Sequence, residues 1–311
     1  MNREETPLRL IVLVNAAAGT FERVGADAVR DTLTAAFEGR AASASISFVA
    51  SDDLRRVAQE SFARARRDGF DGVVVGGGDG TIRAVAGALV GTDLPLGVLP
   101  LGTLNHFARD LGLPLALDDA VAVICGGKTR AIDVGDVNGE IFINNSGIGL
   151  YPFLVLDRDR RRVRLRLTKW TAMLLAVLRL WRRFPLRRLV IAVEGRAEPF
   201  RTPIVFVGNN EYGLSFSALG KRERLDAGTL WICVSRARRP AALLWVAIRA
   251  AFGFVDRDRG LEVAQAASAE IRSRASKLLV ALDGEVEIMR PPLRYRIRPG
   301  ALRVFVPAPP A

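Results

Sequence analysis

The stretch Val73-Val74-Val75-Gly76-Gly77-Gly78-Asp79-Gly80-Thr81 joins a short apolar run to a cluster of glycines, one acid and one threonine. This pattern predicts a buried strand, a tight turn and the start of a helix. Glycines permit positive φ angles and a close approach of backbone N–H groups to phosphates, and a helix N-terminus adds partial positive charge. The carboxylate of Asp79 would repel phosphates unless a divalent cation lay between them. The stretch therefore predicts a phosphate-binding turn, with a plain tight turn capped by Asp79 as the alternative.

A second turn, Leu99-Pro100-Leu101-Gly102-Thr103-Leu104-Asn105, also follows an apolar run and opens a predicted helix. In a parallel sheet, strand-to-helix turns of this kind meet at the edge that binds ligands. Thr103 and Asn105 can offer a hydroxyl and an amide to phosphate or ribose, although a Gly-Thr helix cap would also explain Thr103. The two turns together favour nucleotide binding more strongly than either turn alone.

The sequence pattern changes near residue 130. Before that point, apolar runs such as Leu8–Val14 and Leu94–Leu99 alternate with amphipathic segments such as Phe21–Phe37, which predicts an α/β domain with a parallel sheet. After it, short alternating runs separated by turns predict a mainly antiparallel, β-rich domain. Two amphipathic helices are expected as insertions in this second half, at Arg164–Phe184 and Ala241–Phe254. We expect domains at residues 1–130 and 131–311, with the last strand able to pack back on the first domain.

Composition excludes several classes of protein. The 311 residues include a single histidine, His106, and only two widely separated cysteines, which excludes a His-based zinc site and a disulfide framework. No run of about 18 uncharged apolar residues occurs, so a transmembrane helix is not expected. The first apolar run, Leu8–Val14, lacks the basic leader and cleavage site of an export signal. These features favour a cytoplasmic protein.

The positive charge is concentrated in one segment. Of the formal net charge of +12, the segment Arg158–Arg188 supplies twelve basic residues and one acid, and the rest of the chain has 33 basic and 32 acidic residues. Apolar residues between Trp170 and Trp181 recur at helical spacing, so they share one face of the predicted helix. Tryptophan and arginine on such a helix suit the headgroup zone of an anionic membrane. The alternative is a helix that packs on the sheet with its arginines in solvent. No nucleic-acid-binding motif occurs, so nucleic acid is not an expected partner.

The two turns and several later segments resemble the diacylglycerol kinase catalytic-domain family. These bacterial lipid kinases are related to sphingosine and ceramide kinases, and their superfamily includes NAD kinase. The resemblance extends over nearly the whole chain and rests on five motifs in the same order. They are Gly77–Thr81, Leu99–Ala108, Ile132–Gly139, Phe142–Gly149, and the pair Leu225–Leu230 and Leu282–Glu285.

The resemblance implies roles for individual residues. The acid Asp79 is expected to be catalytic, and Asp283 or Glu285 is expected to act as the base on the lipid hydroxyl. Asp226 resembles a ligand of a structural magnesium that backbone carbonyls complete. Family members commonly have Asp where Ala227 stands, and many have Asp at His106. The nucleotide contacts implied are Asn15, Ser51, Gly77, Gly78, Asp79, Gly80, Thr81, Gly102, Thr103 and Asn105.

The function implied is that of an ATP- and Mg2+-dependent lipid kinase with diacylglycerol as the default acceptor. ATP would bind the loops of the first domain, and the lipid would bind over the second, in a cleft between the two. The enzyme would work at the cytoplasmic face of the inner membrane, docked through Arg158–Arg188. The alternatives are a soluble-substrate kinase of the NAD kinase type and a nucleotide- or lipid-binding protein with impaired catalysis. The oligomeric state stays open, with a homodimer as one alternative.

Overall fold

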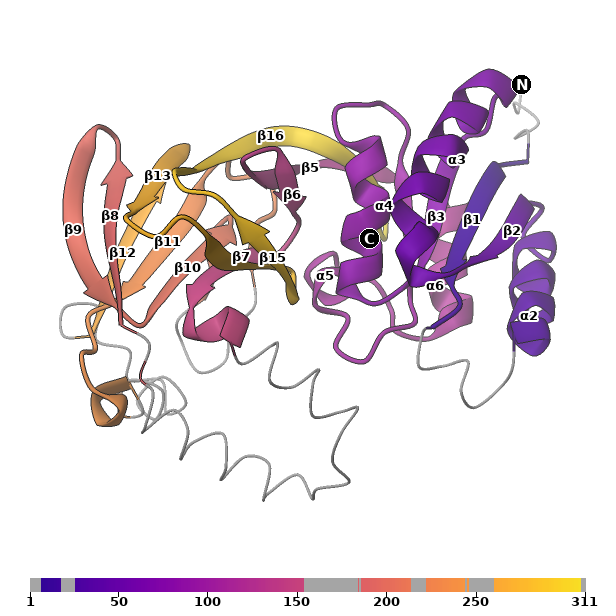
Figure 1. Ribbon diagram of the computed structural model, residues 1–311. Helices are drawn as coiled ribbons and strands as arrows, with labels where there is room; N and C mark the ends of the chain where they lie inside the picture. Colours follow the sequence, from indigo (N-terminus) through magenta and orange to yellow (C-terminus); the bar gives the residue numbers. More distant parts are fainter. Residues whose placement is uncertain are drawn as a thin grey trace, which may run out of the picture. The chain divides into compact units, whose positions relative to one another are not determined.

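A computed structural model describes residues 7–17, 26–153, 184, 186–213, 222–243, 245 and 260–308 (Figure 1). The chain forms two compact units. Unit 1 comprises Met1–Ile132 and Gly300–Ala311, and unit 2 comprises Asp133–Pro299. Each unit is described by itself below.

Unit 1 is built on a parallel sheet with the strand order β2-β1-β3-β4. Its strands are β1 (Arg9–Asn15), β2 (Ser43–Val49), β3 (Gly72–Gly77) and β4 (Leu96–Pro100). Val304, in the end of β16 (Leu293–Phe305), pairs in parallel with Leu96 of β4. This pairing adds the end of β16 to the sheet of unit 1.

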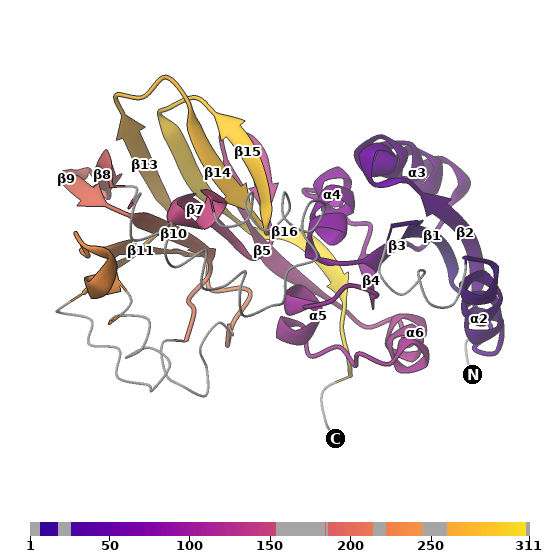
Figure 2. The ribbon, with the colours of Figure 1, turned by 60° about the horizontal axis from the view of Figure 1, so that its bottom comes forward.

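Helices cover both faces of this sheet (Figure 2). One face carries α3 (Leu54–Asp68), preceded by the short η1 (Ser51–Asp53), and α4 (Asp79–Leu89). The other carries α2 (Ala26–Glu38) and α6 (Leu117–Cys125), while the short α5 (His106–Asp110) follows β4. The central strands read as continuous apolar runs because both of their faces are buried. The α/β fold predicted for this half is confirmed.

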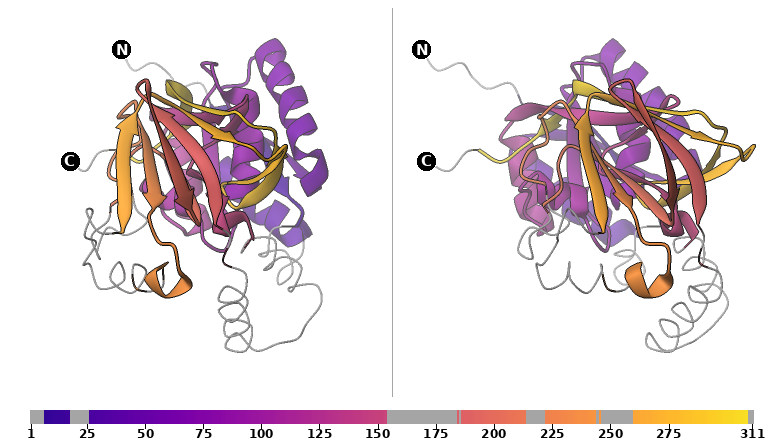
Figure 3. Two further views of the ribbon diagram at one scale, coloured as in Figure 1. Left: turned by 60° about the vertical axis from the view of Figure 1, so that its left-hand side comes forward. Right: turned by 90° about the vertical axis from the view of Figure 1, so that its left-hand side faces the viewer.

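Unit 2 is a sandwich of two mainly antiparallel sheets (Figure 3). One sheet has the order β12-β11-β10-β7-β14-β15. The other contains β13, β8 and β9, together with residues 293–299 of β16 and 133–137 of β5. Alternate side chains of both sheets, including Phe142, Ile232 and Tyr295, fill the core between them. The strand bounds are β5 Thr129–Val137, β6 Glu140–Phe142, β7 Asn145–Gly149, β8 Arg187–Val193, β9 Arg196–Thr202, β10 Ile204–Asn209, β11 Leu230–Ser235, β12 Leu261–Ala266, β13 Ser268–Ser273, β14 Leu278–Leu282 and β15 Glu285–Met289.

The antiparallel, β-rich character of this half is confirmed, but the structure differs from the sequence prediction at several elements. The sequence analysis did not predict α6, β7, β9, β12 or β15. β9 was missed because Pro199 and three charged residues interrupt its apolar pattern, which suits an edge strand. Near the C-terminus, a single long strand, β16, continues through Pro299 and Gly300.

The two predicted inserted helices fall largely outside the described residues. Arg164–Phe184 contributes only Phe184, and Ala241–Phe254 contributes only its beginning. Within the part of the chain that the structure describes, no helix is long and apolar enough to cross a membrane.

Candidate functional site

The glycine turn of unit 1 is tighter than the sequence suggested. β3 continues through Gly77 and α4 begins at Asp79, so Gly78 alone connects them. Gly78 has φ −91°, and none of the glycines of this turn adopts a positive φ. The expectation that positive φ explains these glycines is therefore wrong. Close packing is the reason, because a Cβ on Gly77 would lie 2.6 Å from Cβ of Thr81.

The two predicted phosphate turns touch each other. A Cβ on Gly102 would lie 2.4 Å from Cα of Gly78, so only glycine at position 102 permits this approach. The carboxylate of Asp79 spans the same gap. It accepts hydrogen bonds from the backbone N–H groups of His106 (3.2 Å) and Phe107 (2.9 Å). Asp79 thus ties the first turn to the start of α5.

Asn105 holds its own loop together. Its Nδ2 donates to the carbonyls of Pro100 (3.2 Å) and Gly102 (2.9 Å), and its Oδ1 accepts the N–H of Gly102 (2.9 Å). The residue is buried and has φ +51°, a conformation that asparagine tolerates better than most side chains. Asn105 therefore shapes the loop, whereas its neighbour Thr103 is exposed to solvent.

Three predicted nucleotide contacts form one hydrogen-bonded group. Asn15, the last residue of β1, donates from Nδ2 to Oγ1 of Thr81 at 2.8 Å. Its Oδ1 accepts from Oγ of Ser51 at 3.1 Å and from the N–H of Ala17 at 2.9 Å. The carboxyl ends of β1 and β3 and the connection after β2 thus bring an amide and two hydroxyls together.

The N-terminus of α4 adjoins this group. No side chain caps the helix at Gly78, so its first N–H groups are not satisfied by a capping side chain. An 11-residue helix also places partial positive charge at that end. Uncapped N–H groups, hydroxyls and an amide are suited to binding an anion.

In unit 2, Asp283 and Gly284 form a two-residue hairpin turn between β14 and β15, with φ +50° and +88°. Both carboxylate oxygens of Asp283 accept backbone hydrogen bonds, at 2.7–3.0 Å, from the N–H groups of Ile143, Asn144 and Asn145. Asp283 therefore anchors this turn to the segment before β7. Glu285 begins β15 and is exposed.

A buried arginine, which the sequence analysis missed, supports the same segment. Arg222 donates to the carbonyls of Ile143 (2.7 Å) and Asn209 (3.1 Å) and to Oδ1 of Asn144 (2.7 Å). In the sequence it stands within Lys221-Arg222-Glu223-Arg224, which has the appearance of a solvated run of charges. No pattern in this run distinguishes Arg222 from Glu223 and Arg224, which are exposed.

The predicted magnesium ligand Asp226 lies in a well-ordered turn. Asn210 Oδ1 accepts the N–H of Ala227 and Asp133 Oδ2 accepts the N–H of Gly228. The carboxylate of Asp226 itself forms an ion pair with Arg224 at 3.1 Å. Among the described residues, no group of three His, Cys, Asp or Glu side chains could hold a metal. The predicted magnesium site takes backbone carbonyls besides Asp226, so it stays a prediction, with the Asp226 carboxylate paired to Arg224 at the surface.

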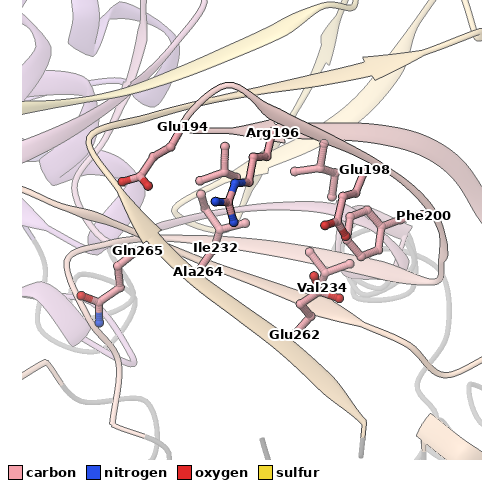
Figure 4. A pocket seen from close by; sticks show the side chains of 11 residues that line it. Glu194, Arg196, Glu198, Phe200, Ile232, Val234, Glu262, Ala264 and Gln265 are labelled. Carbon is pink, nitrogen blue, oxygen red and sulfur yellow. The ribbon is translucent and has the colours of Figure 1, made fainter. Parts of the chain in front are cut away.

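Unit 2 also has a cavity of about 500 Å³ at the edge of the sandwich (Figure 4). Apolar side chains from both sheets, among them Val193, Phe200 and Ile232, line its interior, and charged side chains such as Arg196 and Glu262 surround them. None of the predicted site residues lines this cavity. It is therefore distinct from the acidic turn at Asp283.

Comparison with known proteins identifies the class of the chain. The diacylglycerol kinase catalytic domain matches residues 9–137. A protein of Pseudomonas aeruginosa named as a probable lipid kinase, YegS-like, is 33% identical over 271 residues, covering 82% of each chain. The probable lipid kinase YegS of Escherichia coli is 46% identical over 89 residues, which is 27% of this chain and 30% of that protein. The chain is thus a kinase, a phosphotransferase enzyme, and it belongs to the YegS-like family of lipid kinases with a diacylglycerol kinase catalytic domain.

Solved structures support the fold. The crystal structure of a putative diacylglycerol kinase from Bacillus anthracis aligns with a TM-score of 0.74 over 96% of both chains, at 21% sequence identity. The similarity covers both units, so the pairing of an α/β unit with a β-sandwich unit is shared with that protein.

Proposed function

We propose that the protein transfers the γ-phosphoryl group of ATP to the hydroxyl of a lipid, with diacylglycerol as the default acceptor. The observation that carries this proposal is the group at the carboxyl edge of the unit 1 sheet, where Asn15, Ser51 and Thr81 adjoin the uncapped start of α4. Backbone N–H groups and hydroxyls in this arrangement suit the phosphates of a nucleotide. The lipid acceptor follows from the family.

Within the nucleotide site, the two glycine turns have different tasks. The turn at Gly77–Thr81 presents its N–H groups to the phosphates. Gly102 lets the second turn approach, and Asp79 fixes the distance between the turns through His106 and Phe107. Asp79, at the first position of α4, is the carboxylate that would hold Mg2+, and the metal would supply neutralisation of charge on the phosphates. Thr103, exposed on the second turn, is the hydroxyl available for the remaining nucleotide contact.

The proposed base is Glu285. Phosphoryl transfer requires a carboxylate that orients the attacking hydroxyl and accepts its proton. Asp283 is engaged by three backbone N–H groups, so removing it would unfasten the turn. Glu285 lies two residues away on the same turn with an exposed side chain. We therefore assign the base to Glu285 and the anchoring of its turn to Asp283.

The proposal is tested by incubating the protein with ATP labelled at the γ-phosphate, Mg2+ and a panel of lipids in mixed micelles. Label is expected on diacylglycerol or on another lipid hydroxyl. Asp79→Ala and Glu285→Ala should each lower turnover more than tenfold, whereas the exposed control acids Asp93→Ala and Glu198→Ala should not. Folded protein that labels no lipid, or that labels NAD instead, would contradict the proposal.

The proposed location is the cytoplasmic face of an anionic membrane, reached through the basic segment Arg158–Arg188. This segment holds twelve of the 45 Lys and Arg residues and one acid. Each basic residue near an anionic leaflet contributes on the order of 1 kcal/mol to binding. Replacement of these arginines by glutamine should therefore release the protein from anionic vesicles at moderate salt.

A further inference from the structure

One face of the β-sandwich carries an unusual concentration of arginines. Leu189, Ile271 and Leu293 point into the core of unit 2, so the alternate residues of the same strands point away from it. We call this outward surface the basic sheet face. It comprises Arg188, Val190, Ala192, Ala197, Pro199, Arg201, Glu270, Arg272, Arg294, Arg296 and Arg298, on β8, β9, β13 and β16.

The face has a clear excess of positive charge. Arg272 and Arg294 share Glu270, and Arg296 contacts Asp136 at 3.2 Å. The face therefore has six arginines and two carboxylates, which gives a net charge of +4. Even without Arg188, the balance of +3 on this face exceeds the net charge of +1 that all residues outside Arg158–Arg188 have together. The arginines are therefore segregated onto this face and do not reflect the composition of the remaining chain.

One pairing among these arginines opposes stability. Arg188 of β8 pairs directly with Arg201 of β9, and like charges in that position destabilise a sheet. Arg272 and Arg294 contact Glu270 and still have side-chain exposures of 63% and 74%. Between the arginines of this face lies a small apolar strip, in which Val190 is 36% exposed beside Pro199. Surface exposure combined with an unfavourable pairing indicates a binding role for the face.

We infer that the basic sheet face docks on the surface of an anionic phospholipid bilayer. Guanidinium groups bind lipid phosphates through paired hydrogen bonds, and an open sheet face presents several of them to a planar partner at once. The face carries no aromatic side chain on which bases could stack, which favours a bilayer over single-stranded nucleic acid. The inference rests on the proposed function in one respect, that a lipid acceptor brings the protein to a membrane.

Vesicle binding without ATP tests the inference. The full-length protein is sedimented with vesicles of phosphatidylglycerol and phosphatidylcholine, and in parallel with phosphatidylcholine alone. The variant R201Q/R272Q/R294Q leaves Arg158–Arg188 intact, so any change arises from the face. We expect its partition onto anionic vesicles to be at least tenfold weaker, since each basic residue near a leaflet is worth a factor of about five and Glu270 offsets part of this.

Two further variants control for charge and folding. R56Q/R66Q/R67Q removes three exposed charges from α3 of unit 1 and should bind as the wild type does. R201K/R272K/R294K retains the charge and should keep most of the binding. Equal loss in the α3 variant, or full binding by R201Q/R272Q/R294Q, would overturn the inference. The inference would also be overturned if a duplex oligonucleotide displaced the protein from the vesicles at a lower concentration than free phosphatidylglycerol does.

The outcome is separable from that of the kinase assay. R201Q/R272Q/R294Q should phosphorylate a lipid dispersed in neutral detergent micelles at the wild-type rate, because none of its changed residues belongs to the proposed site. Weaker vesicle binding in a protein that phosphorylates no lipid would leave the docking face standing and refute the proposed function. Unchanged vesicle binding by a variant that still phosphorylates lipid would refute the docking face and leave the proposed function standing.

Discussion

Replacing Asp283 by asparagine should damage the fold of unit 2, whereas replacing Glu285 by glutamine should damage turnover alone. Asp283 Oδ1 accepts the N–H groups of Asn144 and Asn145, and Oδ2 accepts that of Ile143. Asparagine keeps one of these oxygens and turns the other into an NH2 donor. The new NH2 group would then face a backbone N–H group, and two donors cannot form a hydrogen bond. Glu285 begins β15 with an exposed side chain.

The magnitude follows from these bonds. Hydrogen bonds to a charged group contribute about 1.5–3 kcal/mol and neutral ones about 0.5–1.5 kcal/mol, so the two retained bonds weaken by about 1 kcal/mol each. The N–H group that loses its acceptor costs a further 1–3 kcal/mol or so. Asp283→Asn should therefore lower the free energy of unfolding by about 3–5 kcal/mol. Exposed substitutions such as Glu285→Gln usually stay within about 0.5 kcal/mol.

Urea unfolding and turnover, measured on both variants, check the reasoning. We expect a lower unfolding midpoint for Asp283→Asn with residual turnover under conditions in which it stays folded. Glu285→Gln should keep the wild-type midpoint and lose more than tenfold in turnover. If Asp283→Asn unfolds as the wild type does while losing its turnover, Asp283 acts in the chemistry and the assignment of the base is refuted. Glu198→Gln, exposed in the same unit, is the matched control.

Two other predictions concern packing and burial. Gly102→Ala places a Cβ 2.4 Å from Cα of Gly78, so the two turns must separate, and we expect KM for ATP to rise at least tenfold with a loss of about 1–3 kcal/mol in stability. Gly126→Ala, at a helical φ of −65°, should change neither, and an unaltered KM in Gly102→Ala would contradict the packing argument. Burial raises the pKa of the Cys233 thiol to about 12. The unfolded chain releases this proton near pH 8.5, so the free energy of unfolding should fall with rising pH between about 8.5 and 10, by up to about 1.4 kcal/mol per unit. The pH slope, compared between wild type and Cys233→Ala, should be shallower in the variant, and equal slopes would show that the thiol does not contribute.

The fold could be predicted where local pattern and tertiary environment agree. Runs such as Leu10–Val14 and Val73–Val75 are buried on both faces, so their apolar composition identifies central parallel strands. β9 could not be found in this way, because an edge strand needs charge and proline to prevent further pairing. β15 was hidden for another reason. Its residues Glu285 and Glu287 interrupt the apolar pattern, and Glu285 also belongs to the motif Leu282–Glu285.

The candidate site was predicted at the level of segments. The turns at Gly78 and Gly102 and the residues Asn15, Ser51 and Thr81 do come together in unit 1. The buried Arg222 could not be predicted, because its role depends on three acceptors between 13 and 79 residues away in the sequence. Contacts between residues so far apart do not produce a periodic pattern in the sequence.

The aspartates of the motifs share a role that motif recognition does not reveal. Asp79, Asp133 and Asp283 each accept backbone N–H groups from a distant segment, so each fastens one loop to another. A short carboxylate with little conformational freedom suits this task, because few rotamers are lost when it is fixed. Glutamate reaches further from the backbone, and Glu285 is the acid of these motifs that begins an exposed strand end. Substitutions of Asp133 and Asp283 should therefore act first on loop geometry and stability, those of Asp79 on both stability and turnover, and those of Glu285 on the chemical step.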